Sequence, residues 1–244
     1  MFFGALTPPF RGRPVHSRVQ VFFKIEAGAL AEKLPEKTRP RTWRGECLGE
    51  LRFSRLDAGR ALLRPLSGRT DHFSCRFAVD METPDGLQPR TWVLARKTSS
   101  WFEAVYDNVL LGSGYKRSRF LVTDEANRFD LLIAGDGRAE VKLSAEAVER
   151  SCSVLFPSAR AVQEFLGSTH RLEPFDCRAP EAGDDPPVHL ALEPLLLHEL
   201  EARTFEAFPA GSITVDSAWR WVAQRRVFAS ETAFESRDSA VPAT

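Results

Sequence analysis

The chain has 244 residues, of which 43% are hydrophobic and 27% are charged, and its formal net charge is zero. A chain of this length and composition buries enough surface to fold without disulfide bonds. Nucleic-acid and anionic-membrane binders usually carry a basic excess, so we expect neither partner. We find no run of about 18 apolar residues that would span a membrane, and residues 1–14 lack the pattern of a signal peptide. We therefore expect a cytoplasmic protein.

The first predicted strands are short apolar segments at residues 19–25 and 44–53. The clearest strand covers residues 72–81, where large apolar side chains at every second position predict one face against a core. Residues 83–86, Thr-Pro-Asp-Gly, provide turn chemistry before another strand at 91–97. These two strands are predicted to form a hairpin.

The pattern then changes to that of a helix at residues 100–111. Apolar residues recur there at the three- and four-residue spacing of one helix face. Ser100 and Glu103 have the spacing of a capping box at its start, and Gly112 and Gly114 are suited to end it.

The rest of the chain is predicted to be mostly strands. Residues 115–123, 128–133 and 138–143 are expected to form a meander, with a tight turn at Asp136-Gly137. A shorter helix is predicted at 158–166 and a surface loop at 179–187. The later strands are expected at 188–192, 200–205 and 211–222. We predict a single, mainly β domain over residues 1–228, with a flexible tail at 229–244.

The four cysteines, at positions 47, 75, 152 and 177, are widely spaced and form no CxxC pair. This spacing indicates neither a zinc site nor a redox dithiol. We expect reduced thiols in the core, no metal site and no cofactor.

Basic residues gather on the strands at either side of the predicted helix. Strand alternation places one aromatic and two arginines of the second strand on a common face. That face is either a solvated surface that discourages edge pairing or an anion site, because arginine offers a planar fork to carboxylate or phosphate. The residues of this cluster are Arg96 and Lys97 on the first strand, and Tyr115, Lys116, Arg117 and Arg119 on the second.

Arg76 and Asp80 share the polar face of the strand at 72–81. They are either a half-exposed ion pair of small energetic weight, or a guanidinium and a carboxylate that line the inside of a barrel. Strand alternation alone does not distinguish the inside of a barrel from its outside.

Several segments together resemble the uncharacterised YqjF-like family of the acetoacetate-decarboxylase-like superfamily. The resemblance extends over about residues 44–228 and lies in the order and spacing of the segments. These segments are 76–80 (RFAVD), 84–86 (PDG), 95–100 (ARKTSS), 114–122 (GYKRSRFLV) and 208–217 (FPAGSITVDS). It implies a closed, cone-shaped antiparallel β barrel with a polar pocket inside, and a homo-oligomer. Together with the two predicted helices, the expected fold is such a barrel with one longer and one shorter helix.

The resemblance also implies a chemistry, from which this chain departs. In the decarboxylase a lysine forms a Schiff base with a β-keto acid, and a second lysine lowers its pKa. The matching segment here reads Ala95-Arg96 or, shifted by one residue, Arg96-Lys97. Arginine cannot form a Schiff base, and a one-residue shift exchanges the sheet faces. The unshifted match, in which the chemistry is lost, is therefore preferred.

Three hypotheses follow for the function. The first is a barrel that binds a small organic acid, with Arg76, Arg96, Arg119 and Tyr115 as ligand-binding residues. In this hypothesis Asp80 orients the ligand or receives a proton. The second is a Schiff-base decarboxylase or lyase that uses Lys97. The third is a non-catalytic interaction domain whose helix at 100–111 packs on a partner.

Overall fold

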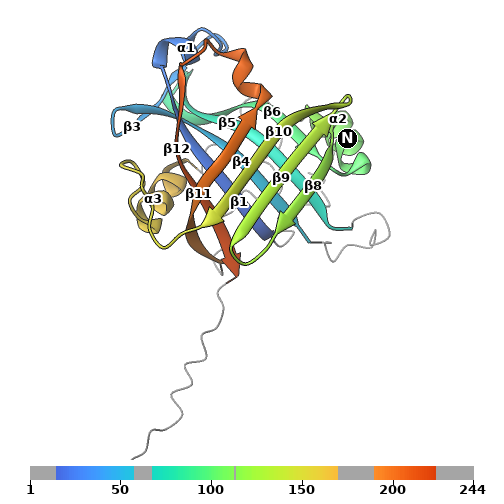
Figure 1. The fold of residues 1–244 in the computed structure, drawn as a ribbon. Coiled ribbons are helices and arrows are strands. Elements are labelled where there is room, and N and C mark those ends of the chain that lie inside the picture. Colours follow the sequence, from blue (N-terminus) through green and yellow to red (C-terminus); the bar gives the residue numbers. More distant parts are fainter. Residues whose placement is uncertain (1–14, 58–67, 113, 170–189, 224–244) are drawn as a thin grey trace, which may run out of the picture.

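The computed structural model describes residues 15–57, 68–112, 114–169 and 190–223 (Figure 1). The predicted loop at 179–187 and the predicted tail at 229–244 lie outside these residues. The helical elements are α1 (Ala27–Ala31), α2 (Trp101–Leu111), α3 (Ala159–Thr169) and the short 3-10 helix η1 (Arg203–Ala207). The strands are β1 (Val15–Ile25), β2 (Thr38–Pro40), β3 (Thr42–Trp43), β4 (Glu46–Leu56), β5 (Thr70–Thr83), β6 (Gly86–Thr98), β7 (Tyr115–Arg117), β8 (Arg119–Asp124), β9 (Arg128–Gly135), β10 (Arg138–Ala147), β11 (Leu190–Ala202) and β12 (Ile213–Ala223).

All the described strands belong to one sheet. Its order is β7-β6-β5-β4-β1-β12-β11-β10-β9-β8, with β2 added to β5 and β3 added to β4. The sheet curls into a nearly closed barrel with one unsealed seam, at its two end strands β7 and β8 (Figure 1). The prediction of a mainly β barrel with few helices is confirmed, and the structure adds that the closure is incomplete.

The barrel consists of two halves that are each continuous in sequence. The first half contains β1, β4, β5, β6 and β7, and the second contains β8 to β12. On one side the halves are joined by antiparallel pairing of β1 with β12. On the other side the chain crosses between them at Ser118, and the seam lies there.

The inward face of β5 is formed as its alternation predicted. Phe73, Cys75, Phe77 and Val79 are all buried in one apolar cluster with inward residues of most other strands. Burial raises the pKa of the Cys75 thiol to about 12, which suits a core residue. At Gly49 on β4 the core is so close that an added Cβ would lie 2.2 Å from the Phe23 ring.

The cysteines were expected to be reduced core residues. Cys47 and Cys75 are free and buried, as expected, whereas the free thiol of Cys152 is exposed. The fourth, Cys177, lies outside the described residues.

The strand predicted at 115–123 is divided in the structure. β7 pairs with β6 in parallel, whereas β8 pairs with β9 in antiparallel orientation. Between them, the backbone N–H of Ser118 donates to the carbonyl of Thr98 at 3.0 Å. The break also alters the predicted common face, because Tyr115 is buried while Arg117 and Arg119 are exposed.

The helix α2 begins and ends where the sequence indicated. The Ser100 side chain accepts a hydrogen bond from the Glu103 backbone N–H, and Gly112 ends the helix in the left-handed conformation with φ 65°. The helix is held to the barrel through a buried polar residue, since Glu103 contacts His72 at 2.9 Å. Its residues Trp101, Val105 and Val109, spaced four apart, form an exposed apolar stripe. The interaction-domain alternative rests on this stripe.

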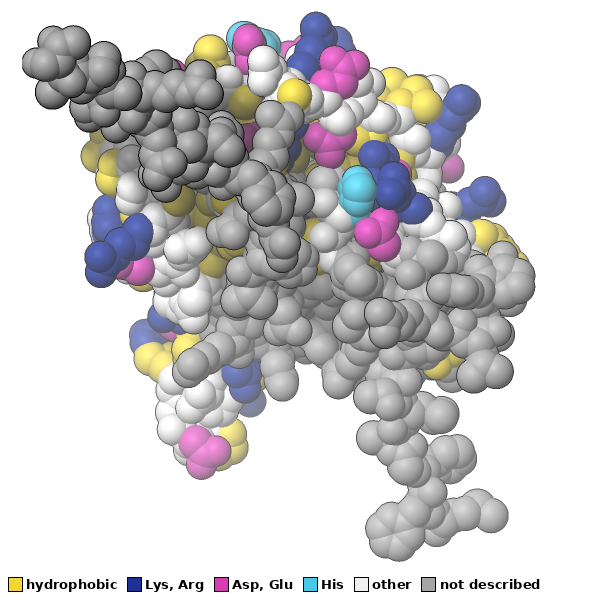
Figure 2. All heavy atoms as spheres, turned by 90° about the horizontal axis from the view of Figure 1, so that it is seen from below, with side chains coloured by type: hydrophobic (Ala, Val, Ile, Leu, Met, Phe, Trp, Pro, Cys, Tyr) yellow, Lys and Arg dark blue, Asp and Glu magenta, His cyan; other side chains and the backbone are white. Residues whose placement is uncertain are grey.

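The helix α3 packs outside the barrel, where Phe165 and Leu166 join a second apolar cluster with Phe22 and Trp219. Figure 2 shows the lower end of the molecule, where positive and negative side chains are interspersed over the described surface. Among the described residues, no helix has both the length and the apolar character needed to cross a bilayer.

Candidate functional site

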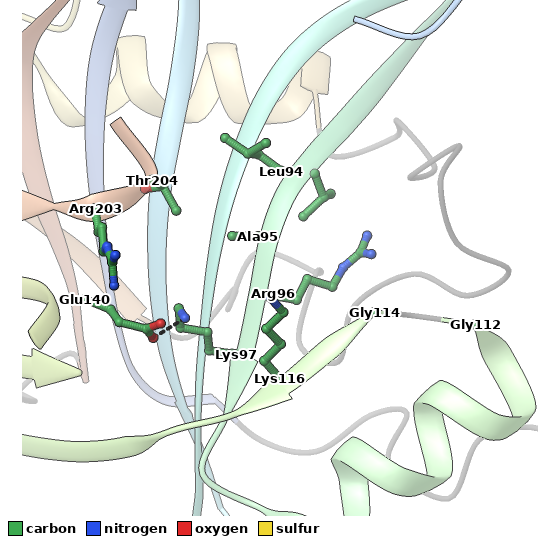
Figure 3. Close-up of a pocket in the computed structure, with 11 residues that line it drawn as sticks. Leu94, Ala95, Arg96, Lys97, Gly112, Gly114, Lys116, Glu140, Arg203 and Thr204 are labelled. Carbon is green, nitrogen blue, oxygen red and sulfur yellow. Dashed lines mark hydrogen bonds and ion pairs between the residues drawn. The ribbon is translucent and has the colours of Figure 1, made fainter. Parts of the chain in front are cut away.

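The structure separates Arg96 and Lys97, which are adjacent in sequence. Lys97 is paired in register with Phe73 of the core, whereas Arg96 is paired with Ser74 on the outer face of β5. Figure 3 shows the two side chains extending from β6 in different directions, with Lys97 directed toward Glu140. The predicted catalytic lysine therefore lies at the inner side of the barrel wall, and Arg96 at the outer side.

Lys97 forms an ion pair across the seam with Glu140 of β10 (Figure 3). The side chains of Lys97 and Glu140 are 8% and 19% exposed. A bulge in β10, between the pairings of Ala139 and Val141, falls at Glu140. The pair thus links the inner end of β6 to the second half of the barrel at the place where the sheet is not closed by hydrogen bonds.

A pocket of about 450 Å³ surrounds this ion pair. Its walls come from β6, the segment after α2, β7, β10 and η1, so it lies beside β7, one of the two strands that border the open seam. The charged groups directed into it are those of Lys97, Lys116, Arg203 and Glu140 (Figure 3). Arg96 also lines it, but its guanidinium extends away from Glu140 (Figure 3). Lys116 is paired in register with Lys97 on the neighbouring parallel strand, which brings two lysines to one side of the wall. Arg203 is also paired with Glu206 at 3.5 Å. The lining therefore contains more cationic side chains than carboxylates.

Arg76 and Arg96 belong to a different, outer-face cluster on β1, β4, β5 and β6, in which both arginines are buried. At its centre Glu50 receives two hydrogen bonds from Arg52, at 2.6 and 3.1 Å, and one from Gln20 at 2.7 Å. Burial alone would raise the pKa of Glu50, but Arg52, Arg76 and Gln20 together lower it to about 2. This cluster holds a carboxylate in its ionised form.

The remaining predicted site residues lie elsewhere. Asp80 is half-buried on β5 and paired in register with Arg39 and Pro89. Arg119 is exposed on β8, across the seam from β7. Tyr115 is buried, and its ring meets that of His72 edge-on at 5.8 Å between ring centroids. The structure thus brings Arg76 and Arg96 to one face, with Asp80 further along β5 on that face, and places Lys97 and Arg119 elsewhere.

Two residues of the pocket, Glu140 and Arg203, were missed by the sequence reasoning. Glu140 lies 43 residues from Lys97 in sequence, and the two meet because the barrel curls, which no local pattern records. Lys116 was noticed in the basic cluster but was not connected to Lys97, because the parallel pairing of β6 with β7 was not foreseen. Within the described part of the chain, no group of three or more His, Cys, Asp or Glu side chains could hold a metal ion.

Comparison with known proteins gives a fold and no sequence family. No family model matches the chain, and no curated protein matches it. Among solved structures, the enduracididine biosynthesis enzyme MppR complexed with pyruvate has a TM-score of 0.53 at 14% identity, over 90% of this chain and 89% of that one. Acetoacetate decarboxylase from Legionella pneumophila also has a TM-score of 0.53, at 10% identity, over 86% of this chain and 84% of that one. The chain therefore has the fold of the acetoacetate decarboxylase-like enzymes.

Proposed function

We propose that the protein binds a small organic acid in the seam pocket. The observation that carries this proposal is the excess of cationic side chains in the lining of the cavity, to which Glu140 contributes one carboxylate. The cationic residues of the lining are Lys97, Lys116, Arg96 and Arg203, of which Arg203 is also paired with Glu206. An ammonium or guanidinium in a partly enclosed pocket attracts a carboxylate more strongly than it does in water. Lys97 supplies the buried charge, and the exposed Lys116 and Arg203 guide the anion to it.

The size of the pocket suits this class of ligand. A cavity of about 450 Å³ is at the small end of the range typical of small-molecule sites. MppR, which shares the fold, is described in complex with pyruvate, so a 2-oxo acid of a few carbons is a suitable first probe. The YqjF-like assignment, the cytoplasmic location and the homo-oligomer stay predictions.

The Schiff-base alternative is supported by one observation, the register pairing of Lys97 with Lys116. A neighbouring cation is the arrangement that activates a lysine amine for attack on a carbonyl. The contact that Lys97 makes, however, is with the carboxylate of Glu140, so its amine group is occupied by a carboxylate and is not free to approach a carbonyl carbon. We therefore propose non-covalent binding and treat the lyase as the second candidate.

Titration calorimetry of the intact protein with pyruvate, acetoacetate and longer carboxylic acids tests the proposal. We expect binding by the wild type and a loss of at least about 10-fold in affinity for Lys97→Met, which removes one charge-assisted hydrogen bond. Lys24→Met is the matched control, because Lys24 is also paired with a glutamate, Glu46 at 3.8 Å, but lies on β1. Equal affinities for wild type and Lys97→Met would contradict the proposal.

The variant Arg96→Ala distinguishes an anion site on the outer face of the barrel wall from one on the inner face. If the outer-face pair Arg76 and Arg96 is the anion site, as the sequence predicted, Arg96→Ala abolishes binding while Lys97→Met leaves it intact. We expect the reverse. Borohydride treatment in the presence of acetoacetate or pyruvate, followed by peptide mass measurement, tests the lyase. A trapped adduct on Lys97 would replace non-covalent binding by the Schiff-base reaction.

A further inference from the structure

We propose that Glu140 is an internal competitor for the ligand's carboxylate at Lys97. In the protein without ligand, the Glu140 carboxylate is paired with the Lys97 ammonium group. The carboxylate of the incoming acid takes the place of the Glu140 carboxylate. This inference rests on the proposed binding of an organic acid in the seam pocket and states how that site is regulated.

The Lys97–Glu140 contact is of the same chemical kind as the contact that we expect between Lys97 and a bound carboxylic acid. Glu140 presents a carboxylate to a lysine whose side chain is 8% exposed, at the edge of a cavity large enough for a small acid. A carboxylic acid that enters this cavity offers Lys97 the same group that Glu140 offers. The two carboxylates therefore compete for one cation.

Glu140 is positioned for this contact by the backbone around it. An added Cβ on Gly135 of β9 would lie 2.7 Å from Oε2 and 2.9 Å from Oε1 of Glu140. The carboxylate thus lies directly over a glycine, in a space that any larger residue would fill. The bulge at Glu140 in β10 interrupts the regular pairing with β9 at the same place.

The displaced side chain has a place to go. Glu140 and Arg203 line both the seam pocket and a second cavity of about 440 Å³. Arg138 also lines that second cavity. Its lining includes Lys142, Glu201 and Glu206 as well, and Glu206 is paired with Arg203 at 3.5 Å. A rotation of the Glu140 side chain moves its carboxylate from Lys97 into this space, where Arg138 borders it. The contact with Lys97 is in this way exchangeable.

With competition of this kind, the apparent affinity for the ligand equals the intrinsic affinity multiplied by the fraction of molecules in which Lys97 is accessible. If Glu140 occupies Lys97 in about 90% of empty molecules, its removal strengthens binding about 10-fold. We expect Glu140→Gln to bind pyruvate about 10-fold more tightly than the wild type does. We also expect a larger increase in melting temperature on addition of pyruvate, because the empty variant has lost an ion pair that the ligand restores.

Calorimetry with pyruvate on four forms of the full chain tests the inference. Glu201→Gln is the matched control, because Glu201 lines the second cavity and the same charge is removed without a contact to Lys97; its affinity should equal that of the wild type. Gly135→Ala keeps every charge and displaces the Glu140 carboxylate, so it should bind several-fold more tightly. It also provides the test if Glu140→Gln does not fold.

The outcomes separate the inference from the proposed function. Tighter binding by Glu140→Gln and Gly135→Ala, with Glu201→Gln unchanged, supports the inference. If the wild type binds pyruvate and both variants bind it equally or more weakly, Glu140 is part of the ligand site or of the scaffold, and the inference is wrong while the proposed function stands. If neither the wild type nor the variants bind any acid of the panel, the proposed function fails and the inference fails with it.

Discussion

Two glutamate–cation pairs lie at the two faces of the same barrel wall, and they are built differently. On the outer face, Glu50 accepts three hydrogen bonds from Arg52 and Gln20 and is 8% exposed. At the seam, Glu140 contacts one side chain among the described residues, Lys97, and borders two cavities. The first carboxylate is surrounded by partners, whereas the second has one partner and adjacent space.

This difference distinguishes the Glu50 cluster, which suits a structural role, from the Lys97–Glu140 pair, which is open to exchange with a ligand. A buried carboxylate with several partners cannot be removed without leaving buried charges uncompensated. A carboxylate with one partner and a cavity beside it can be exchanged for water or for a ligand at small cost. The number of partners and the adjacent space are therefore the reasons for proposing the ligand site at the seam and not at Glu50.

The largest effect is expected on the free energy of unfolding. Glu50→Gln should lower it by about 3–5 kcal/mol, because the buried charges of Arg52 and Arg76 lose their common counter-ion. Glu140→Gln should lower it by about 1–2 kcal/mol, because Lys97 borders a cavity that admits water. Urea unfolding of both variants gives the two values, and equal losses would remove the distinction between the pairs.

The second effect concerns pH. The pKa of Glu50 is lowered from 4.5 to about 2 in the folded protein. Its contribution is therefore fully present above pH 4.5, the unfolded value, and is lost as the pH falls toward 2. The shift corresponds to roughly 3 kcal/mol. The stability of the wild type, measured by urea midpoints between pH 2 and 6, should fall across this window, and Glu50→Gln should show a much flatter profile. Parallel profiles would mean that Glu50 is not held ionised by its neighbours.

The smallest effect is expected from exchanging the cations. Arg52→Lys should lose about 1 kcal/mol, because an ammonium does not reproduce the two parallel hydrogen bonds of the guanidinium to Glu50. Lys97→Arg should change stability by less than about 0.5 kcal/mol, because the larger group extends into the adjacent cavity. Thermal unfolding of the two variants compares them, and a greater loss for Lys97→Arg would show that the seam pair is the more closely constrained.

Much of the fold could be predicted because it is encoded locally. The alternation around Phe77 identified the inward face of β5, and the spacing of Ser100 and Glu103 identified the start of α2. The turn at Asp136-Gly137 could be predicted because Asp-Gly is a residue pair that tolerates positive φ. In the structure the two residues have φ angles of 49° and 75°. The continuity of β11 was missed, since Pro194 lies within it and proline usually interrupts a ladder.

The site was less accessible, because it depends on curvature and register. Sequence identified Lys97 as a candidate amine but grouped it with Arg96, which the alternation of β6 directs to the other face. It predicted correctly that Arg76 and Asp80 share a strand, but not that Arg76 would be buried outside the barrel beside Glu50. The partners of Lys97 come from β7 and β10, and only the curled sheet brings these strands together.

The pairing of β1 with β12 has a consequence for how the protein is made. The indole N–H of Trp221 donates to Gln20, 201 residues earlier, so the two halves of the barrel meet only when the last strand has been synthesised. Each half contains mainly local antiparallel pairs that can form early, whereas joining them closes a very long loop and is therefore slow. Until β12 leaves the ribosome, β1 can pair with β4 on one side only, and its other edge is open, with the apolar residues Val19, Val21 and Phe23 on its inward face. Such an edge is a template for pairing with other chains, so we expect the nascent chain to be prone to aggregation until β12 is available to pair with β1.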